Sequence, residues 1–361
     1  MLNSTLLDNL NTTASNLPGP LLSKTLFFHD VQITCQTNHP AILAILDAML
    51  GMYSEPARIR GEAFYSIFCY NNFSQFPIQI PSDRRPIEAV RLVTNTKLKY
   101  YHSPDHTTQY HSYAALPTVN APALTVINSD DHIALTQLEM PEQYQVKFLH
   151  RYVLLIALGQ LTRNLDFEPC HAAAITAPWD NQQCALIIGT SRSGKTTLSL
   201  SCTLAGSGLL GDDLIMLGND TPLINAFTIM HEVSIRTDSL DLLQSLSFLK
   251  AFPADDRDKH YCAIEEIRTG ATCFKAPIRL LIFPSLSTET ESLLTPLSKA
   301  DTLQMLIDEC FSKKYLYPQA QEQFFSLLYR LSEQAKGYKL TIALGATDGP
   351  RIVQSLFSGS P

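Results

Sequence analysis

Residues 184–217 read CALIIGTSRSGKTTLSLSCTLAGSGLLGDDLIML, and this stretch decides the fold of the chain. The apolar run 184–188, closed by a glycine, has the length and composition of a buried parallel strand. Residues 189–196 match the phosphate-loop pattern G-x-x-x-x-G-K-[ST]. A helix is predicted over residues 196–205, and a second strand begins at residue 209. This order of elements predicts an α/β core built around a nucleotide phosphate site.

The loop pattern supplies backbone and side-chain groups suited to phosphates. Glycines let the backbone curl so that successive N–H groups can face phosphate oxygens, and the dipole of the following helix adds to the attraction. Lys195, interpreted as an exposed loop residue, can reach the β- and γ-phosphates, and the Thr196 hydroxyl can ligate Mg²⁺. The predicted nucleotide-binding residues are Gly189, Thr190, Ser191, Arg192, Ser193, Gly194, Lys195, Thr196 and Thr197.

Two adjacent aspartates follow the predicted helix, inside the apolar run that resumes at residue 214. Asp212 and Asp213 are costly within an apolar strand unless a cation or another partner satisfies them. Mg²⁺ held by one aspartate, with the other accepting a hydroxyl proton, satisfies both carboxylates. A solvated Asp-Asp turn is the alternative, which the preceding Gly211 favours. The sequence leaves open which aspartate has which role.

The loop GTSRSGKTTLS followed by LLGDD resembles the nucleotide site shared by HPr kinase/phosphorylase and phosphoenolpyruvate carboxykinase. CHAAAI, residues 170–175, resembles the His-bearing strand that precedes the loop in HPr-kinase-like proteins, and the likeness covers residues 168–217. It implies a P-loop-containing mixed-sheet α/β core of the HPr kinase C-terminal domain type, and the strand and helix patterns before it predict a smaller N-terminal α+β lobe. It also implies an ATP- and Mg²⁺-dependent transfer of the γ-phosphoryl group to a serine hydroxyl. The implied catalytic residues are Asp212, Asp213, His171 and Lys195, and the implied metal ligands are Thr196, Asp212 and Asp213.

Two departures from that family keep other functions open. Arg192 stands where the family usually has the middle glycine of its loop, and no convincing copy of the family's C-terminal signature is present. Because arginine disfavours positive φ, we expect a loop conformation compatible with a side chain, with the guanidinium directed toward the acceptor. The alternatives are a small-molecule kinase, and a nucleotide-binding regulatory protein with little or no transfer. The small-molecule enzyme would need carboxylate-binding arginines, for which the candidates are Arg236, Arg279 and Arg351.

Two further segments have more than one interpretation. His171 stands among alanines, either as a core histidine satisfied by backbone groups or as a neighbour of the phosphates and the aspartate pair. Residues 253–267, PADDRDKHYCAIEEI, form the most charged part of the chain. We interpret them as a solvated loop, and the alternative is a mobile flap that brings Arg257 or Lys259 toward the phosphates.

Length, composition and net charge bear on the number of domains and on the class of partner. With 361 residues, 45% of them hydrophobic, the chain can hold two lobes. We predict a loose segment 1–20, an N-terminal lobe 21–145 and a kinase domain 146–361. The net charge of −7 argues against a nucleic-acid partner, and no apolar run is long enough for a membrane span. The expected partner is a protein or peptide acceptor, including the precursor of a modified peptide; an oligomer is compatible with the resemblance.

The remaining patterns predict the other elements. No basic, apolar leader is recognised, and the eight cysteines are scattered without a C-x-x-C pair, which favours reduced thiols in a cytoplasmic protein. His102, His106 and His111 are expected on a polar surface loop, where a metal site lacks a rigid frame. The predicted strands are 25–37 (one strand or a hairpin), 60–70, 89–101, 122–138, two within 224–236, 277–284 and 338–344; the predicted helices are 40–52, 141–164, 238–249, 300–311, 319–334 and one at the C-terminus.

Overall fold

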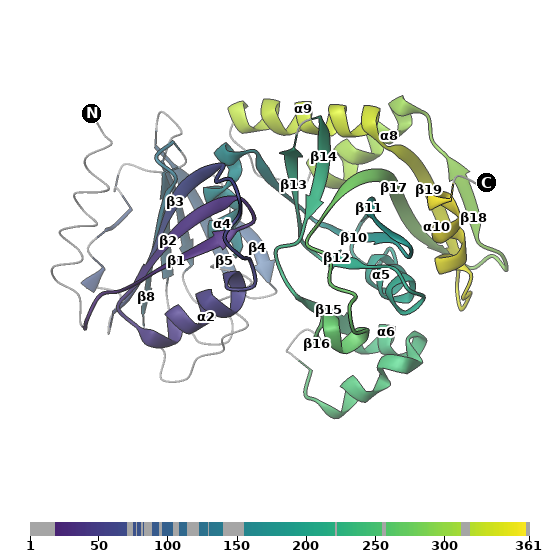
Figure 1. Cartoon of the computed structure of the whole chain (residues 1–361), viewed down its shortest axis with the longest axis horizontal. Helices are drawn as coiled ribbons and strands as arrows, with labels where there is room; N and C mark the ends of the chain where they lie inside the picture. Colours follow the sequence, from purple (N-terminus) through teal and green to yellow (C-terminus); the bar gives the residue numbers. More distant parts are fainter. Residues whose placement is uncertain are drawn as a thin grey trace. The chain divides into compact units, whose positions relative to one another are not determined.

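The computed structural model describes residues 19–70, 75–76, 78–80, 82, 89–93, 96–103, 108–113, 123–128, 130–139, 155–220, 222–254, 258–311 and 318–358. Most of the predicted loose segment 1–20 therefore lies outside the described residues. The chain divides into two compact units, Met1–Phe167 and Glu168–Pro361 (Figure 1). Each unit combines helices with its own sheet, as expected for an α/β chain.

The first unit ends later than the predicted lobe boundary at residues 145 and 146 because the segment before Phe167 packs inside it. The Phe167 ring meets the Phe28 ring edge-on, with centroids 5.4 Å apart. A Cβ on Gly61 would lie 2.6 Å from Cδ2 of Leu165, so the strand and this segment approach closely. Of the predicted helix 141–164, the structure describes α4, Leu155–Leu161, followed by a 3-10 helix, Arg163–Leu165.

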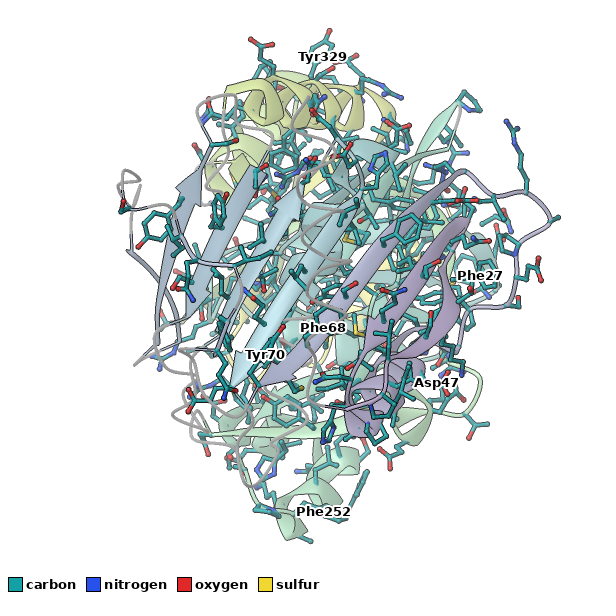
Figure 2. All side chains as sticks on the ribbon, turned by 90° about the vertical axis from the view of Figure 1, so that its left-hand side faces the viewer. Phe27, Asp47, Phe68, Tyr70, Phe252 and Tyr329 are labelled. Atoms are coloured by element: carbon teal, nitrogen blue, oxygen red, sulfur yellow. The ribbon has the colours of Figure 1, made fainter. Side chains whose placement is uncertain are left out.

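The N-terminal unit is built on an eight-stranded sheet with the order β1-β2-β3-β8-β7-β6-β5-β4, and Figure 2 views this sheet with Phe68 and Tyr70 labelled. The predicted stretch 25–37 forms a hairpin, and α2, Pro40–Leu50, follows it and buries its apolar side, as the sequence predicts. The expectation of a histidine-bearing loop is wrong for His102 and His111, which lie in paired strands; His106 lies outside the described residues. The strands are β1 Leu22–Phe28, β2 Val31–Thr37, β3 Gly61–Tyr70, β4 Ala89–Val93, β5 Thr96–His102, β6 Thr108–Tyr113, β7 Ala123–Asn128 and β8 Ile133–Glu139.

The C-terminal unit is built on a nine-stranded mixed sheet with the order β12-β10-β11-β17-β14-β13-β9, to which β19 and β18 add beside β17. Strand β11 is antiparallel to β10 but parallel to β17, and β17 is parallel to β19. A separate pair, β15 with β16, lies beside this sheet. The strands are β9 Phe167–Cys170, β10 Ala172–Ala177, β11 Asp180–Ile188, β12 Leu209–Gly211, β13 Ile215–Asp220, β14 Leu223–Phe227, β15 Glu232–Arg236, β16 Lys259–Ala263, β17 Lys275–Ser287, β18 Leu293–Pro296 and β19 Lys336–Ala343.

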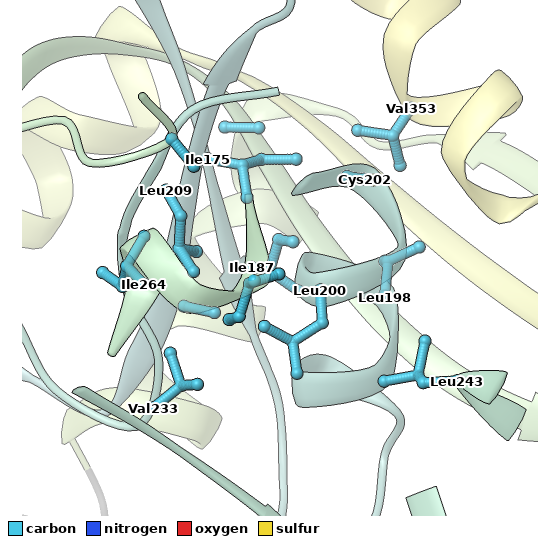
Figure 3. Packing of buried hydrophobic residues seen from close by; sticks show 14 of the residues in the cluster. Ile175, Ile187, Leu198, Leu200, Cys202, Leu209, Val233, Leu243, Ile264 and Val353 are labelled. Carbon is cyan, nitrogen blue, oxygen red and sulfur yellow. The ribbon is translucent and has the colours of Figure 1, made fainter. Parts of the chain in front are cut away.

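Helices cover both faces of this sheet because the central strands are apolar on both sides. Along β11, Leu186 and Ile188 join the cluster that contains α8 and α9, whereas Ile187 joins the cluster that contains α5 and α10. Figure 3 shows the second cluster, with Leu198 and Leu200 of α5 near Ile187. The helices are α5 Lys195–Leu204, α6 Thr237–Leu242, α7 Ile264–Ile267, α8 Lys299–Leu306, α9 Pro318–Gln334 and α10 Gly349–Phe357.

Two predicted helices are shorter than expected, because each changes its hydrogen-bonding pattern partway. The predicted helix 238–249 is α6 followed by a 3-10 helix, Gln244–Ala251, and the predicted helix 300–311 is α8 followed by a π-helical turn, Ile307–Phe311. All eight cysteines are buried thiols, and burial raises the pKa of Cys202 to about 12. Among the described residues, no helix is long and apolar enough to cross a membrane.

Candidate functional site

The phosphate-loop pattern lies between β11 and α5, as the sequence predicts. Gly189 lies close to the rest of the loop, because a Cβ there would lie 2.7 Å from the Ser193 hydroxyl and would force that side chain to move. Gly194 caps the N-terminus of α5 with a φ of +96°, which favours glycine. The Ser193 N–H donates to the Thr190 carbonyl at 3.2 Å, which closes the loop into a tight turn. The loop therefore presents the first N–H groups of α5, the feature that attracts anions.

The expectation for the Arg192 backbone is wrong, since its φ is +67°. The turn between Thr190 and Ser193 demands a left-handed residue at this position, and local loop closure overrides the preference of the side chain. A left-handed conformation costs a non-glycine residue roughly 1–2 kcal/mol. The direction of the guanidinium toward an acceptor stays a prediction.

We expect Arg192→Gly to stabilise the protein by roughly 0.5–1 kcal/mol, because glycine relieves the left-handed strain but adds freedom to the unfolded chain. Urea denaturation of the metal-free protein measures the change. Arg192→Ala is the matched control, since it removes the guanidinium but keeps the Cβ and the strain. Equal stability of the two variants would show that the backbone at residue 192 is not strained.

Lys195 is buried, and the expectation of an exposed loop lysine is wrong. Only 6% of its surface is accessible, and its Nζ donates to the carbonyls of Gly189 at 2.7 Å and Thr190 at 3.0 Å. The helix start turns the side chain back into the loop, where two carbonyl oxygens compensate its charge. Phosphate oxygens at this position would replace those carbonyls as partners of the ammonium group.

The aspartate pair lies in a turn between β12 and β13 rather than inside a strand, and Asp213 has a φ of +72°. The turn alternative is therefore correct for the backbone. The same alternative predicted a solvated pair, and this part is wrong for Asp212, because only 1% of the surface of Asp212 is accessible to solvent. The Thr196 hydroxyl lies 2.9 Å from Oδ2 and 3.2 Å from Oδ1 of Asp212. Thr196, in the first turn of α5, therefore contacts the Asp212 carboxylate directly.

Asp213 belongs to a different cluster. Its Oδ2 accepts hydrogen bonds from Lys259 Nζ and Ser234 Oγ, both at 2.9 Å, and Lys259 Nζ lies 3.0 Å from Ser234 Oγ. Lys259 comes from β16 and Ser234 from the paired strand β15. The two aspartates, adjacent in sequence, therefore have separate partners, one from α5 and one from the β15/β16 pair.

The interpretation of residues 253–267 as a solvated loop is wrong for residues 259–267, whereas residues 253, 254 and 258 are exposed and lie outside helices and strands. Residues 259–263 form β16, and α7 follows directly. Burial alternates along this strand, with His260 and Cys262 buried, but the residue types do not alternate between polar and apolar, so the sequence pattern did not predict it. Lys259 does reach the aspartate pair, whereas Arg257 lies outside the described residues.

His171 lies in the bend between β9 and β10, exposed and beside the aspartate pair rather than in the core. Its Nδ1 is 2.7 Å from the carbonyl oxygen of Asp213. Because a carbonyl oxygen can only accept, Nδ1 donates in this contact. Although the residue as a whole is exposed, partial desolvation of the ring by its neighbours lowers the pKa of His171, and the charge of Lys195 lowers it further. At neutral pH the neutral imidazole therefore ties the β9–β10 bend to the turn of the aspartate pair.

Burial, and then the neighbouring charge of Asp213, raise the pKa of Asp212 to about 7. A raised pKa means that folding favours the protonated carboxyl. Its contribution to stability is complete below the unfolded pKa and is lost as the pH rises through about 7. A bound divalent cation would compensate the buried charge at higher pH.

We therefore expect Asp212→Asn, which cannot ionise, to raise the free energy of unfolding at pH 8 by roughly 1–3 kcal/mol. At pH 5, where Asp212 is protonated in the folded state, the gain should shrink. Urea denaturation in EDTA at both pH values measures this difference. Asp213→Asn is the control and should not stabilise at pH 8, because it removes the acceptor of Lys259 and Ser234. An equal effect of Asp212→Asn at both pH values would contradict the buried-charge account.

The residues present fit a magnesium nucleotide. Thr196 and Asp212 supply a hydroxyl and a carboxylate whose oxygens lie within 3.2 Å of each other, the hard oxygen ligands that Mg²⁺ prefers. The Ser193 hydroxyl is buried and has no hydrogen-bond partner among the described residues, so it can form a hydrogen bond with an oxygen of a bound nucleotide. The three candidate arginines lie on three elements: Arg236 at the end of β15, Arg279 on β17 and Arg351 on α10.

Comparisons with known proteins add little to this geometry. No protein-family model matches the chain, and no curated protein matches its sequence. Among solved structures, the chain is similar to the HPr(Ser) kinase/phosphatase from Coxiella burnetii, with 12% identity and a TM-score of 0.31. The match covers 53% of this chain and 89% of that chain. A likeness of this size supports no conclusion about function, so the site itself must carry the proposal.

Proposed function

We propose that the C-terminal unit transfers the γ-phosphoryl group of ATP to a serine hydroxyl of a protein or peptide. One observation carries the proposal: three groups meet where strands β11 and β12 end. They are the phosphate loop, a buried carboxylate that is hydrogen-bonded to Thr196, and a second carboxylate that is hydrogen-bonded to Lys259. These groups combine an anion site, oxygen ligands for a cation and a proton acceptor, the three requirements of phosphoryl transfer. The motif resemblance selects the serine acceptor.

The loop and the start of α5 would bind the phosphates. Lys195 and the amides of the loop would donate to the β- and γ-phosphate oxygens. Thr196 and Asp212 would hold Mg²⁺, which neutralises charge on the phosphate oxygens when it is bound. The structure thus supports one assignment of the aspartate roles, because only Asp212 is bonded to the Thr196 hydroxyl in the described site.

Asp213 would accept the proton of the serine hydroxyl. As the serine oxygen bonds to the γ-phosphorus, the bond between that phosphorus and the β–γ bridging oxygen breaks, and ADP leaves. Lys259 and Ser234 orient the carboxylate through Oδ2, and His171 holds its backbone carbonyl. These three residues are positioning residues, because they act through Asp213.

Incubation with γ-labelled ATP, Mg²⁺ and serine-containing peptides or proteins tests the proposal, together with calorimetry of ATP binding. Label on serine, lost in the Asp213→Asn variant, is the expected result. Label on a small molecule would favour the small-molecule kinase. Tight ATP binding without transfer to any acceptor would replace the proposal with a regulatory nucleotide-binding function.

A further inference from the structure

A cavity of about 340 Å³ lies beside the phosphate loop, and its lining residues outside the loop have no role assigned so far. Its walls come from the loop, from β17 and β19, and from α8 with its π-helical turn. We propose that this cavity binds the purine nucleoside of the triphosphate whose phosphates occupy the loop. The inference rests on the proposed function and names the remaining part of the same binding site.

The order of strands places the cavity on the correct side of the loop. In the sheet order β12-β10-β11-β17, with β19 beside β17, the loop follows β11 at the centre (Figure 1). Asp212 and His171 lie on the β12 and β10 side, where the γ-phosphate must be. A nucleotide that crosses the loop therefore directs its nucleoside toward β17 and β19. Strands β11, β17 and β19 are parallel, and ligands of α/β sheets bind at the carboxyl ends of such strands.

The walls of the cavity suit a flat heteroaromatic group with a polar edge. Met305 and Leu286 supply apolar surface, and Leu286 is 49% exposed at the end of β17, next to the loop; Phe283 lines the cavity with only 2% of its surface accessible. Glu309 supplies a carboxylate acceptor for ring or exocyclic N–H groups, and Lys339 supplies a donor. The volume lies within the range of small-ligand pockets, about 300–1,000 Å³.

A second, independent observation points to a ligand. The Ser193 hydroxyl is 8% exposed, lines this cavity and has no hydrogen-bond partner among the described residues. An unsatisfied buried hydroxyl costs about 1–3 kcal/mol, and a bound ribose or phosphate oxygen would satisfy it. The polar atom and the apolar walls thus meet in one cavity, which is the composition of a nucleotide site.

The test compares Mg²⁺ complexes of ATP, GTP and inorganic tripolyphosphate by calorimetry. We expect at least one of the two nucleotides to bind tenfold or more tightly than tripolyphosphate. Ser285→Leu, which extends an apolar side chain into the cavity, should reduce nucleotide affinity to that of tripolyphosphate without weakening tripolyphosphate itself. Arg279→Leu, on the same strand but outside the cavity lining, is the control and should bind like wild type.

Because Ser285 is partly buried, Lys339→Ala provides an exposed second variant, which should lower nucleotide affinity alone. Equal affinity of the wild type for both nucleotides and tripolyphosphate would overturn this inference while leaving the phosphate site intact. Wild-type nucleotide affinity in both cavity variants would also overturn it. Binding of none of the three compounds would overturn the proposed function, and this inference with it.

Discussion

Replacing Asp213 with asparagine should leave Mg·ATP bound but lower phosphoryl transfer by roughly 10²–10⁴-fold, the usual share of general base catalysis. The amide preserves the shape of the side chain but accepts a proton poorly. Nucleotide affinity should change little, since the metal ligands Thr196 and Asp212 are retained. Single-turnover transfer and calorimetry of the same variant measure the two effects separately.

Lys259→Met provides a companion to this variant, because it keeps the length of the side chain but removes the donor to Asp213. It should lower transfer less than Asp213→Asn and shift the pH profile of the remaining transfer. A purely structural lysine would alter stability and leave that profile unchanged. Full transfer by Asp213→Asn would show that this carboxylate is not the base.

Lys195→Met should weaken Mg·ATP binding by roughly 10–100-fold or more, because the charge-assisted hydrogen bonds to two phosphates are lost. The buried position of Lys195 makes methionine a better probe than alanine, since it retains the apolar stem and leaves no cavity. Calorimetry measures the affinity, and a thermal melt of the ligand-free protein establishes that the fold survives.

Ser201→Ala is a mild control on the same helix, α5, which changes a side chain outside the predicted nucleotide-binding residues and leaves the loop charge in place. It should retain most of the nucleotide affinity. Wild-type affinity in a folded Lys195→Met protein would contradict the assignment of the loop as a phosphate site.

Local patterns in the sequence were sufficient for the strand, loop and helix around residues 184–204. The prediction used the run of apolar residues, the spacing of the glycines and the position of Lys195. Each of these patterns involves only a few neighbouring residues, so it can be recognised in the sequence without knowledge of tertiary contacts. Arg192 shows the limit of this reading, because the closure of the loop outweighed the preference of one side chain for negative φ.

The sequence by itself determined the α/β class of the C-terminal unit, the position of the glycine-rich loop between its strand and helix, and the presence of an acidic pair after that helix. Only the tertiary structure separated Asp212 from Asp213, because their partners Thr196 and Lys259 lie 16 and 46 residues away along the chain. The strand pair that brings Lys259 to the site, and the parallel strands that form the cavity wall, join segments by backbone hydrogen bonds. Such long-range pairing depends on register and packing, which no local pattern specifies.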